Sequence, residues 1–196
     1  MKKIYTLSKT SLYQGFFKLD HYHVCHDTFA GGQLQVQREH LERGDAAAIV
    51  LFDKARDEVL LLEQFRIGPA VRQEPAWLIE VVAGMIDQGE TAQQAARREA
   101  IEEVGYEPTE IKHLGCYYTT PGGSSEKLDL FLGLVDRAKP VHAGGGMLAE
   151  GEDIRHFWLS RTETMLWVQQ GKINSGGPML ALLLAFGSTG LAYQID

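Results

Sequence analysis

The stretch from Gly84 to Pro108, GMIDQGETAQQAARREAIEEVGYEP, contains the clearest helix signal in the chain. Thr91 and Gln94 have the spacing of a capping box, and Gly105 stands where a left-handed residue would end a helix. We therefore predict a helix from about residue 91 to residue 104. The apolar run WLIEVVAG just before it, at 77–84, indicates a buried strand.

The segments on either side of this stretch predict further strands. The runs AAAIVLFD (46–53) and EVLLLEQFRI (58–67) are joined by the polar turn KARD, which is typical of a hairpin. Later strands are expected at IKHLGCYYTT (111–120), KLDLFLGLV (127–135) and IRHFWL (154–159). Glycine-rich loops separate them.

Two C-terminal helices complete the expected elements. The segment 160–172 has Ser160 and Glu163 in capping-box spacing, and the segment 177–186 has Pro178 at a plausible first helical position. Strands and helices are mixed along the chain without a regular βαβ repeat. We therefore predict an α/β (α+β) fold with a mixed sheet and helices packed on its faces.

The first 43 residues contain short alternating segments and an Ala-Gly-Gly step at Ala30, which predict a small antiparallel sheet with a hairpin turn. We expect a segment 1–44 of this kind, followed by a main domain at 45–196. The small sheet alone buries little surface, so it should pack on another body.

Composition excludes several classes of function. The chain has 196 residues and a net charge of −7, which argues against binding nucleic acid through its phosphates. The two cysteines, Cys25 and Cys116, are too few for a disulfide framework and read as free thiols in the cytoplasm. The first residues, MKKIYTLSKTSLYQGFF, carry two lysines but no apolar h-region, and the run MLALLLAF is too short to span a membrane, so we expect a soluble protein.

Three glutamates lie close together on the predicted helix. Glu102 and Glu103 are adjacent, and they follow Glu99 by three and four residues, which is about one helical turn. The negative charges of the three side chains therefore repel one another. A compensating dication is the natural hypothesis, and carboxylate ligands favour Mg²⁺ or Mn²⁺. The alternative is that these are solvated charges paired with Arg97 and Arg98. The small residues Ala92, Ala95 and Ala96 on the same face favour burial of the acids instead.

The same residues resemble a family signature, the Nudix box G-x5-E-x7-R-E-U-x-E-E-x-G-U, in which U is bulky and apolar. All fixed positions are met, by Gly84, Glu90, Arg98, Glu99, Glu102, Glu103 and Gly105. The U positions hold Ala100 and Tyr106, which depart from the usual choice and affect the expected local packing.

The resemblance implies a Nudix hydrolase with an α/β/α sandwich that uses divalent metal to cleave a nucleoside diphosphate linked to another group. By this likeness Glu99, Glu103 and the backbone carbonyl of Ala83 are metal ligands. Glu90 and Arg98 brace the loop and the helix. Glu102 is a further catalytic residue, either as a metal ligand itself or as a group that supports the ligands.

Three segments resemble the ADP-ribose pyrophosphatase branch of this family. They are PGGSSE, with Pro121 fifteen residues after Tyr106, EQFRI followed by WLIEVVAGMI, and LAEGEDIR. The likeness implies that Glu150, in a mobile loop, is the general base and that Glu152 is a further metal ligand. The implied reaction converts ADP-ribose to AMP and ribose 5-phosphate.

The resemblance also implies the substrate contacts. Arg66 binds phosphate, Glu126 binds a ribose hydroxyl, and Phe16 and Arg38 reach the ligand of the partner subunit in a homodimer. For Phe16 and Arg38, roles within the small sheet itself are an equal alternative.

Two other functions remain open. One is a pyrophosphatase acting on GDP-mannose or another sugar nucleotide, and the other is a non-catalytic nucleotide sensor with the same fold. A zinc site at His21, His23, Cys25 and His26 lacks a second ligand cluster and is the weaker interpretation.

Overall fold

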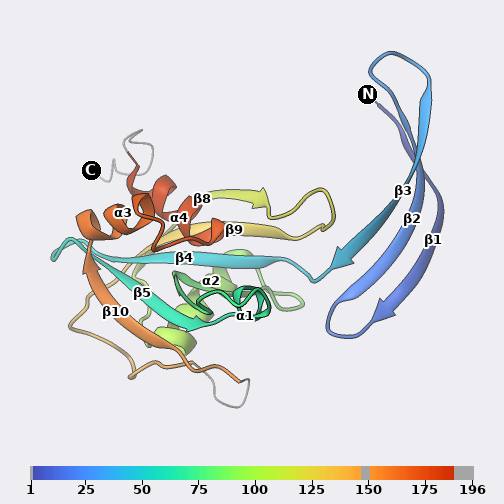
Figure 1. Ribbon diagram of the computed structural model, residues 1–196. Helices are drawn as coiled ribbons and strands as arrows, with labels where there is room; N and C mark the ends of the chain where they lie inside the picture. The colour runs from blue at the N-terminus through green and yellow to red at the C-terminus, as the bar shows by residue number, and fades with distance from the viewer. Residues whose placement is uncertain (1, 147–150, 188–196) are drawn as a thin grey trace. The chain divides into compact units, whose positions relative to one another are not determined.

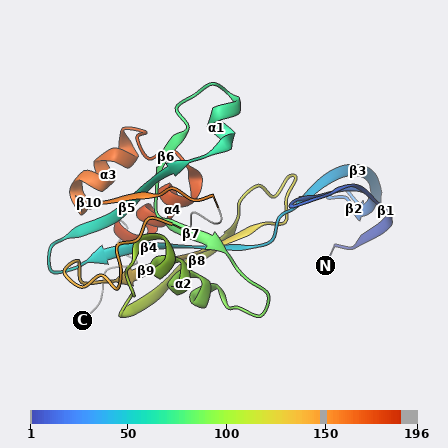
Figure 2. The ribbon, with the colours of Figure 1, turned by 90° about the horizontal axis from the view of Figure 1, so that it is seen from below.

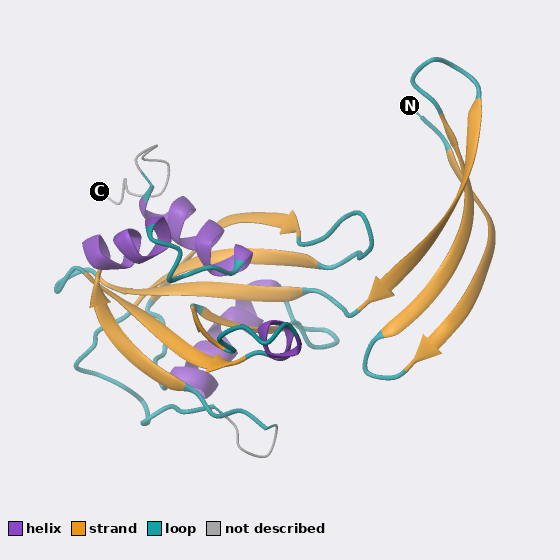
Figure 3. Cartoon of the chain, in the orientation of Figure 1, coloured by secondary structure: helices purple, strands orange, loops and turns teal. Residues whose placement is uncertain are grey.

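The computed structural model describes residues 2–146 and 151–187, which form two compact units (Figure 1). The first unit comprises the described residues up to Asp45 together with Tyr118–Lys127. The second comprises Ala46–Tyr117 and the described residues from Leu128 onward. Figure 3 shows that the first unit consists of strands and loops, whereas the second combines strands with all of the described helices.

The first unit is the predicted antiparallel sheet, with strands in the order β1 (Ile4–Gln14), β2 (Lys18–Asp27) and β3 (Gln33–Glu42). The turn between β2 and β3 contains Gly31 and Gly32, both with positive φ. Residues 118–127 join this unit because the Leu41 N–H donates to the carbonyl of Gly123 at 2.7 Å.

Strand β4 (Ala46–Asp53) is the centre of the sheet in the second unit. It pairs with β5 (Glu58–Phe65) in antiparallel register and with β9 (Lys127–Leu134) in parallel register. Its odd-numbered residues from Ala47 to Leu51 enter one core and its even-numbered residues from Ala48 to Phe52 enter the other. A strand that is apolar on both faces requires cover on both sides.

Helices provide that cover, as Figure 1 shows. Helix α2 (Ala92–Val104) packs on one face of the sheet, and α3 (Arg161–Gln169) and α4 (Gly176–Phe186) pack on the other. The strand order is β10 (Arg155–Ser160), β5, β4, β9 and β8 (Glu110–Tyr118). The predicted mixed sheet between helices is confirmed.

The segment 77–85 differs from the prediction of a single strand. It forms β6 (Trp77–Glu80), which pairs with β5, and then β7 (Val82–Met85), which pairs with β4. Strands β4 and β5 pair with each other only near their shared turn, so the chain bonds first to one and then to the other. The change of partner occurs at Val81, which is buried in the second core.

Two further helix details depart from the sequence interpretation. A short helix, α1 (Ile67–Val71), follows β5 where we expected strand to continue to Ile67, and Figure 2 shows it just beyond the end of β5. Helix α4 begins at Gly176, so Pro178 is its third residue rather than its first. Proline is tolerated there because an N–H in the first turn has no partner within the helix. Within the described residues, no helix is both long enough and apolar enough to cross a membrane.

Candidate active site

Helix α2 carries the acidic residues, and its ends are fixed as the sequence predicts. The Thr91 hydroxyl accepts a hydrogen bond from the Gln94 N–H at 3.3 Å, and the Gln94 side chain accepts one from the Thr91 N–H at 2.9 Å. These two bonds complete the capping box. Gly105, at φ 75°, ends the helix in the left-handed conformation that glycine adopts without strain.

Glu103 lies almost entirely inside the protein, with 2% of its surface exposed. Its carboxylate accepts a hydrogen bond from the Ala83 N–H of β7 at 3.3 Å. Burial, with the negative charges of Glu99 and Glu152, raises the pKa of Glu103 well above its usual range, while Arg66 acts in the opposite direction. Within the described residues no Lys or Arg forms an ion pair with it, so its charge is poorly compensated.

Glu99 lies one helical turn before Glu103 and packs against β7. Burial raises the pKa of Glu99 even though the Arg98 Nη1 atom donates to its carboxylate at 2.7 Å. A Cβ atom at Gly84 would lie 1.9 Å from the Glu99 Oε1 atom, so only glycine leaves room for this carboxylate. The first glycine of the motif therefore has a direct steric role in placing the acid.

Arg98 connects the loop before α2 to the acidic face of the helix. Its Nε and Nη2 atoms each donate to Glu90 at 3.1 Å, and Nη2 also donates to the carbonyl of Met85 at 2.9 Å. Its Nη1 atom donates to Glu99 and, at 3.0 Å, to Glu102. This hydrogen bonding lowers the pKa of Glu90 and raises the pKa of Arg98. The bracing that the resemblance implied for these two residues is consistent with these contacts.

The two apparent departures from the motif are both accommodated by packing. Ala100 is fully buried in the core beneath α2, where a small residue allows close approach to the sheet. Tyr106 packs edge-on against Trp158, with ring centroids 5.4 Å apart, and its hydroxyl donates to the carbonyl of Arg137 at 3.1 Å. Its polar group is therefore satisfied.

The glycine-rich loop after β9 is held against the C-terminal end of α2. The N–H groups of Gly145 and Gly146 donate to the carbonyl of Glu103 at 2.7 and 3.2 Å. At Gly144, which has φ +69°, a Cβ atom would lie 2.6 Å from the carbonyl carbon of Val104. Gly144 therefore allows two backbones to pack closely.

The acidic loop beyond these glycines contains the two remaining predicted acids. The charge of Glu152 acts on Glu99 and Glu103, so all three carboxylates share one electrostatic environment. Glu150, the residue expected to be the general base, lies outside the described residues.

Arg66 follows β5 and is held by a buried carboxylate that the sequence analysis did not single out. Its Nε and Nη2 atoms donate to the same oxygen of Glu80 at 3.1 and 2.7 Å, and Gln64 donates to that oxygen at 3.3 Å. The signal for Glu80 was present, since it is a lone carboxylate within the apolar run WLIEVV.

Arg38 lies in the first unit and lines a cavity of about 300 Å³. Strands β2 and β3 form one wall, and the loop 121–124, which includes Pro121, forms the other. Tyr22 and His40 also line this cavity, with their rings edge to face at 5.8 Å. The segment PGGSSE, which suggested ADP-ribose binding, and Arg38, an implied substrate contact, thus line the same cavity within one unit.

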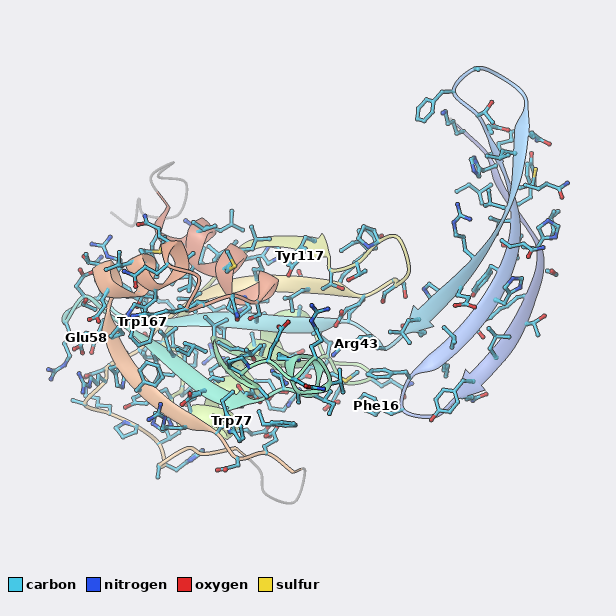
Figure 4. The ribbon with its side chains drawn as sticks, viewed as in Figure 1. Phe16, Arg43, Glu58, Trp77, Tyr117 and Trp167 are labelled. Carbon is cyan, nitrogen blue, oxygen red and sulfur yellow. The ribbon has the colours of Figure 1, made fainter. Side chains whose placement is uncertain are left out.

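Phe16 and Glu126 also lie in the first unit. Phe16 lies in the turn between β1 and β2, where it is 77% exposed (Figure 4). Glu126 is 9% exposed, and its carboxylate accepts a hydrogen bond from the Thr119 hydroxyl at 2.7 Å and pairs with Arg43 at 3.1 Å. Both oxygens of Glu126 therefore have protein partners in addition to any ligand.

The donor set on α2 fits a hard divalent cation. The carboxylate of Glu99 is largely buried and that of Glu103 is fully buried, and carboxylate oxygens are the ligands that Mg²⁺ and Mn²⁺ prefer. Over residues 2–146 and 151–187, no three His, Cys, Asp or Glu side chains gather as a complete metal cage. In the proposed zinc cluster, His23 and Cys25 bond to neighbouring glutamines of β3.

A mixed sheet lies between helices, and a capped helix places two inward-facing glutamates close to the adjacent strand, an arrangement that fits a metal-assisted hydrolase. The sequence matches the NUDIX domain family over residues 42–180, and the chain belongs to that family. The predicted family is therefore confirmed.

Two relatives and one solved structure are similar to this chain over most of its length. The chain is 42% identical over 179 residues to an ADP-ribose pyrophosphatase of Escherichia coli, covering 90% of this chain and 84% of the relative. It is 35% identical over 153 residues to a GDP-mannose pyrophosphatase of Citrobacter koseri, covering 78% of each. A crystal structure of an ADP compounds hydrolase shares the fold, with a TM-score of 0.72, 21% identity, and coverage of 93% of this chain and 92% of that one.

Proposed function

We propose that this protein is an Mg²⁺-dependent ADP-ribose pyrophosphatase that converts ADP-ribose and water to AMP and ribose 5-phosphate, with Mn²⁺ as a substitute metal. The observation that carries the proposal is the pair of inward-facing carboxylates, Glu99 with a largely buried side chain beside Gly84 and Glu103 fully buried without an ion-pair partner among the described residues. The 42% identity to an ADP-ribose pyrophosphatase over most of both chains supports the choice of substrate.

In the reaction, the oxygen of a water molecule bonds to one phosphorus of the diphosphate, and the bond from that phosphorus to the bridging oxygen breaks. The water gives its proton to a carboxylate, for which Glu150 is our candidate. A divalent cation, when bound, neutralises phosphate charge and lowers the pKa of water. Glu99, Glu103, Glu152 and the carbonyl of Ala83 would hold that cation.

Other side chains hold the reactants in place. Arg98 fixes the loop and the helix on which the acids stand, and it keeps Glu102 at 3.0 Å from its guanidinium. Glu102 then supports the site by hydrogen bonding, as its half-exposed position allows. Arg66 binds the diphosphate of the substrate through its guanidinium.

The first unit contributes to recognition in this proposal. Arg38 and Phe16 contact the ligand bound by a partner subunit in a homodimer, and Glu126 orients a ribose hydroxyl. The long, exposed strand β1 is consistent with an association surface, since all of its residues are exposed in the single chain. Neither Cys25 nor Cys116 forms a disulfide among the described residues, which fits a cytoplasmic protein.

A pyrophosphatase for GDP-mannose is the second candidate, and it is favoured by the relative of Citrobacter koseri at 35% identity. Both reactions use the same acidic site, so the base and the sugar distinguish them.

A substrate panel tests the proposal. Initial rates are measured with ADP-ribose, GDP-mannose and other diphosphate sugars, each with Mg²⁺ or Mn²⁺. We expect ADP-ribose to have the highest kcat/KM and activity to disappear with a chelator. A large preference for GDP-mannose would show that GDP-mannose, and not ADP-ribose, is the substrate. Tight binding of ADP-ribose without hydrolysis of any compound would indicate a nucleotide sensor.

A further inference from the structure

We infer that Glu80 and Gln64 are positioning residues that hold the guanidinium of Arg66 in place for the substrate diphosphate. The inference rests on the proposed function, because it takes Arg66 to be a phosphate ligand. Neither Glu80 nor Gln64 belongs to the helix motif, and both act through Arg66 rather than by contact with the substrate.

The backbone of Arg66 is already fixed by the two strands. Arg66 follows β5 directly, and its N–H donates to the carbonyl of Ala76, just before β6, at 2.7 Å. Next to Arg66 in the chain, Phe65 of β5 lies opposite Trp77 of β6, and their rings pack edge to face with centroids 5.7 Å apart. The side chain of Arg66 therefore starts from a well-defined point at the end of the sheet.

The guanidinium of Arg66 is held by the carboxylate of Glu80, which is itself nearly buried and hydrogen-bonded. The side chain of Glu80 is 9% exposed, whereas that of Arg66 is 43% exposed. A buried carboxylate requires a cation or several hydrogen-bond donors, and this one receives three donors on a single oxygen. Gln64 supplies the third donor, which restricts rotation of the Glu80 carboxylate as well.

The pairing leaves part of the guanidinium available. The Arg66 Nε and Nη2 atoms face Glu80, while Nη1 has no hydrogen-bond partner among residues 2–146 and 151–187. Because a guanidinium is planar, fixing one edge fixes the direction of the remaining donors. A phosphate group can then be bound without first ordering the side chain.

A double-mutant cycle tests the inference with wild type, Glu80→Gln, Arg66→Ala and the double variant. Two quantities are measured for each protein: kcat and KM for ADP-ribose with Mg²⁺, and the Kd of ADP by calorimetry. We expect Glu80→Gln alone to raise KM and Kd about tenfold, within the range of coupling between neighbouring polar groups, with kcat changed less than threefold. In the Arg66→Ala background the same change should alter KM and Kd less than twofold.

The matched control is Glu58→Gln, which removes a carboxylate from an arginine pair at the other end of β5. Glu58 pairs with Arg137 at 2.6 Å, and the side chain of Arg137 is 42% exposed, close to the value for Arg66. Figure 4 marks Glu58 at the start of its strand. We expect its KM and Kd to match wild type.

Equal losses from Glu80→Gln in both backgrounds would overturn the inference, because the effect would then not pass through Arg66. This outcome can occur while ADP-ribose is hydrolysed normally by the wild type. Conversely, if the wild type does not hydrolyse ADP-ribose but the cycle with ADP shows coupling, the proposed substrate fails and the positioning role stands. Melting temperatures of all variants identify any general loss of folding.

Discussion

Replacing Gly84 by alanine should disable the site while leaving the fold intact. The new Cβ atom would lie 1.9 Å from the Oε1 atom of Glu99 and 2.0 Å from its Cδ atom. Gly84 lies in β7 opposite Ala47 and has no positive φ, so its backbone accepts alanine without strain. The steric conflict therefore falls on the carboxylate of Glu99.

The size of the effect follows from the distance that the carboxylate must move. To reach ordinary van der Waals separation it must retreat by roughly 1.5 Å. Displacement of a reacting or ligating group by about 1 Å costs about 100-fold in rate, which corresponds to about 2.7 kcal/mol of transition-state stabilisation. The helix capping and the two cores do not depend on Glu99, so the melting temperature should change little.

The assay compares Gly84→Ala with Gly176→Ala, measuring kcat for ADP-ribose, the Mg²⁺ concentration for half-maximal rate, and the melting temperature. Gly176 lies in α4, and a Cβ atom there meets nothing within 4 Å. We expect a loss of about 100-fold and a weaker Mg²⁺ response only at Gly84. Full activity of Gly84→Ala with an unchanged Mg²⁺ requirement would refute the steric reasoning.

Three other substitutions have outcomes that follow from the contacts described above. Glu103→Gln should abolish hydrolysis yet raise the melting temperature in a chelator, because it removes a buried and poorly compensated charge; a lower melting temperature would contradict this. Hydrogen bonds to the Glu42 carboxylate, above all the one from the Gly44 N–H, lower the pKa of Glu42. The ionised carboxylate therefore stabilises the first unit at any pH above the usual carboxyl pKa. This stabilisation is lost as the pH falls through the lowered pKa of Glu42 in the folded protein. Glu42→Gln should therefore speed hydrogen exchange of the Gly44 amide at pH 7, and the difference from wild type should vanish in acid. Gly144→Ala should destabilise the protein by about 1–3 kcal/mol, measured by denaturant unfolding, because its Cβ atom would collide with the backbone of Val104; an unchanged midpoint would show that this loop is not fixed.

The parts of the fold that local chemistry controls could be predicted from the sequence. Helix α2 begins at a capping box formed by Thr91 and Gln94 and ends at Gly105 in the left-handed conformation. Each of these effects depends only on residues close together in the chain, so the residue types alone predict them. The two apolar runs at 46–53 and 58–65 predicted a hairpin for the same reason.

Features that depend on distant partners could not be predicted in this way. The break at Val81 arises because β4 and β5 diverge, and nothing in the apolar run WLIEVVAG records which strand each half will meet. The association of Gly123 with Leu41 likewise links positions far apart in the chain. The motif located the acids, but only the structure shows that Glu80 holds Arg66.

The two-sided character of β4 has a consequence for protein engineering. Ala47, Ile49 and Leu51 support the layer that carries the acidic helix, whereas Val50 and Phe52 face α3 and α4. The latter compartment can be redesigned for heat tolerance, with larger or better-fitting side chains, while the compartment under the acids is left untouched. Substitutions on one face of β4 should thus change thermal stability, whereas substitutions on its other face should change catalytic activity.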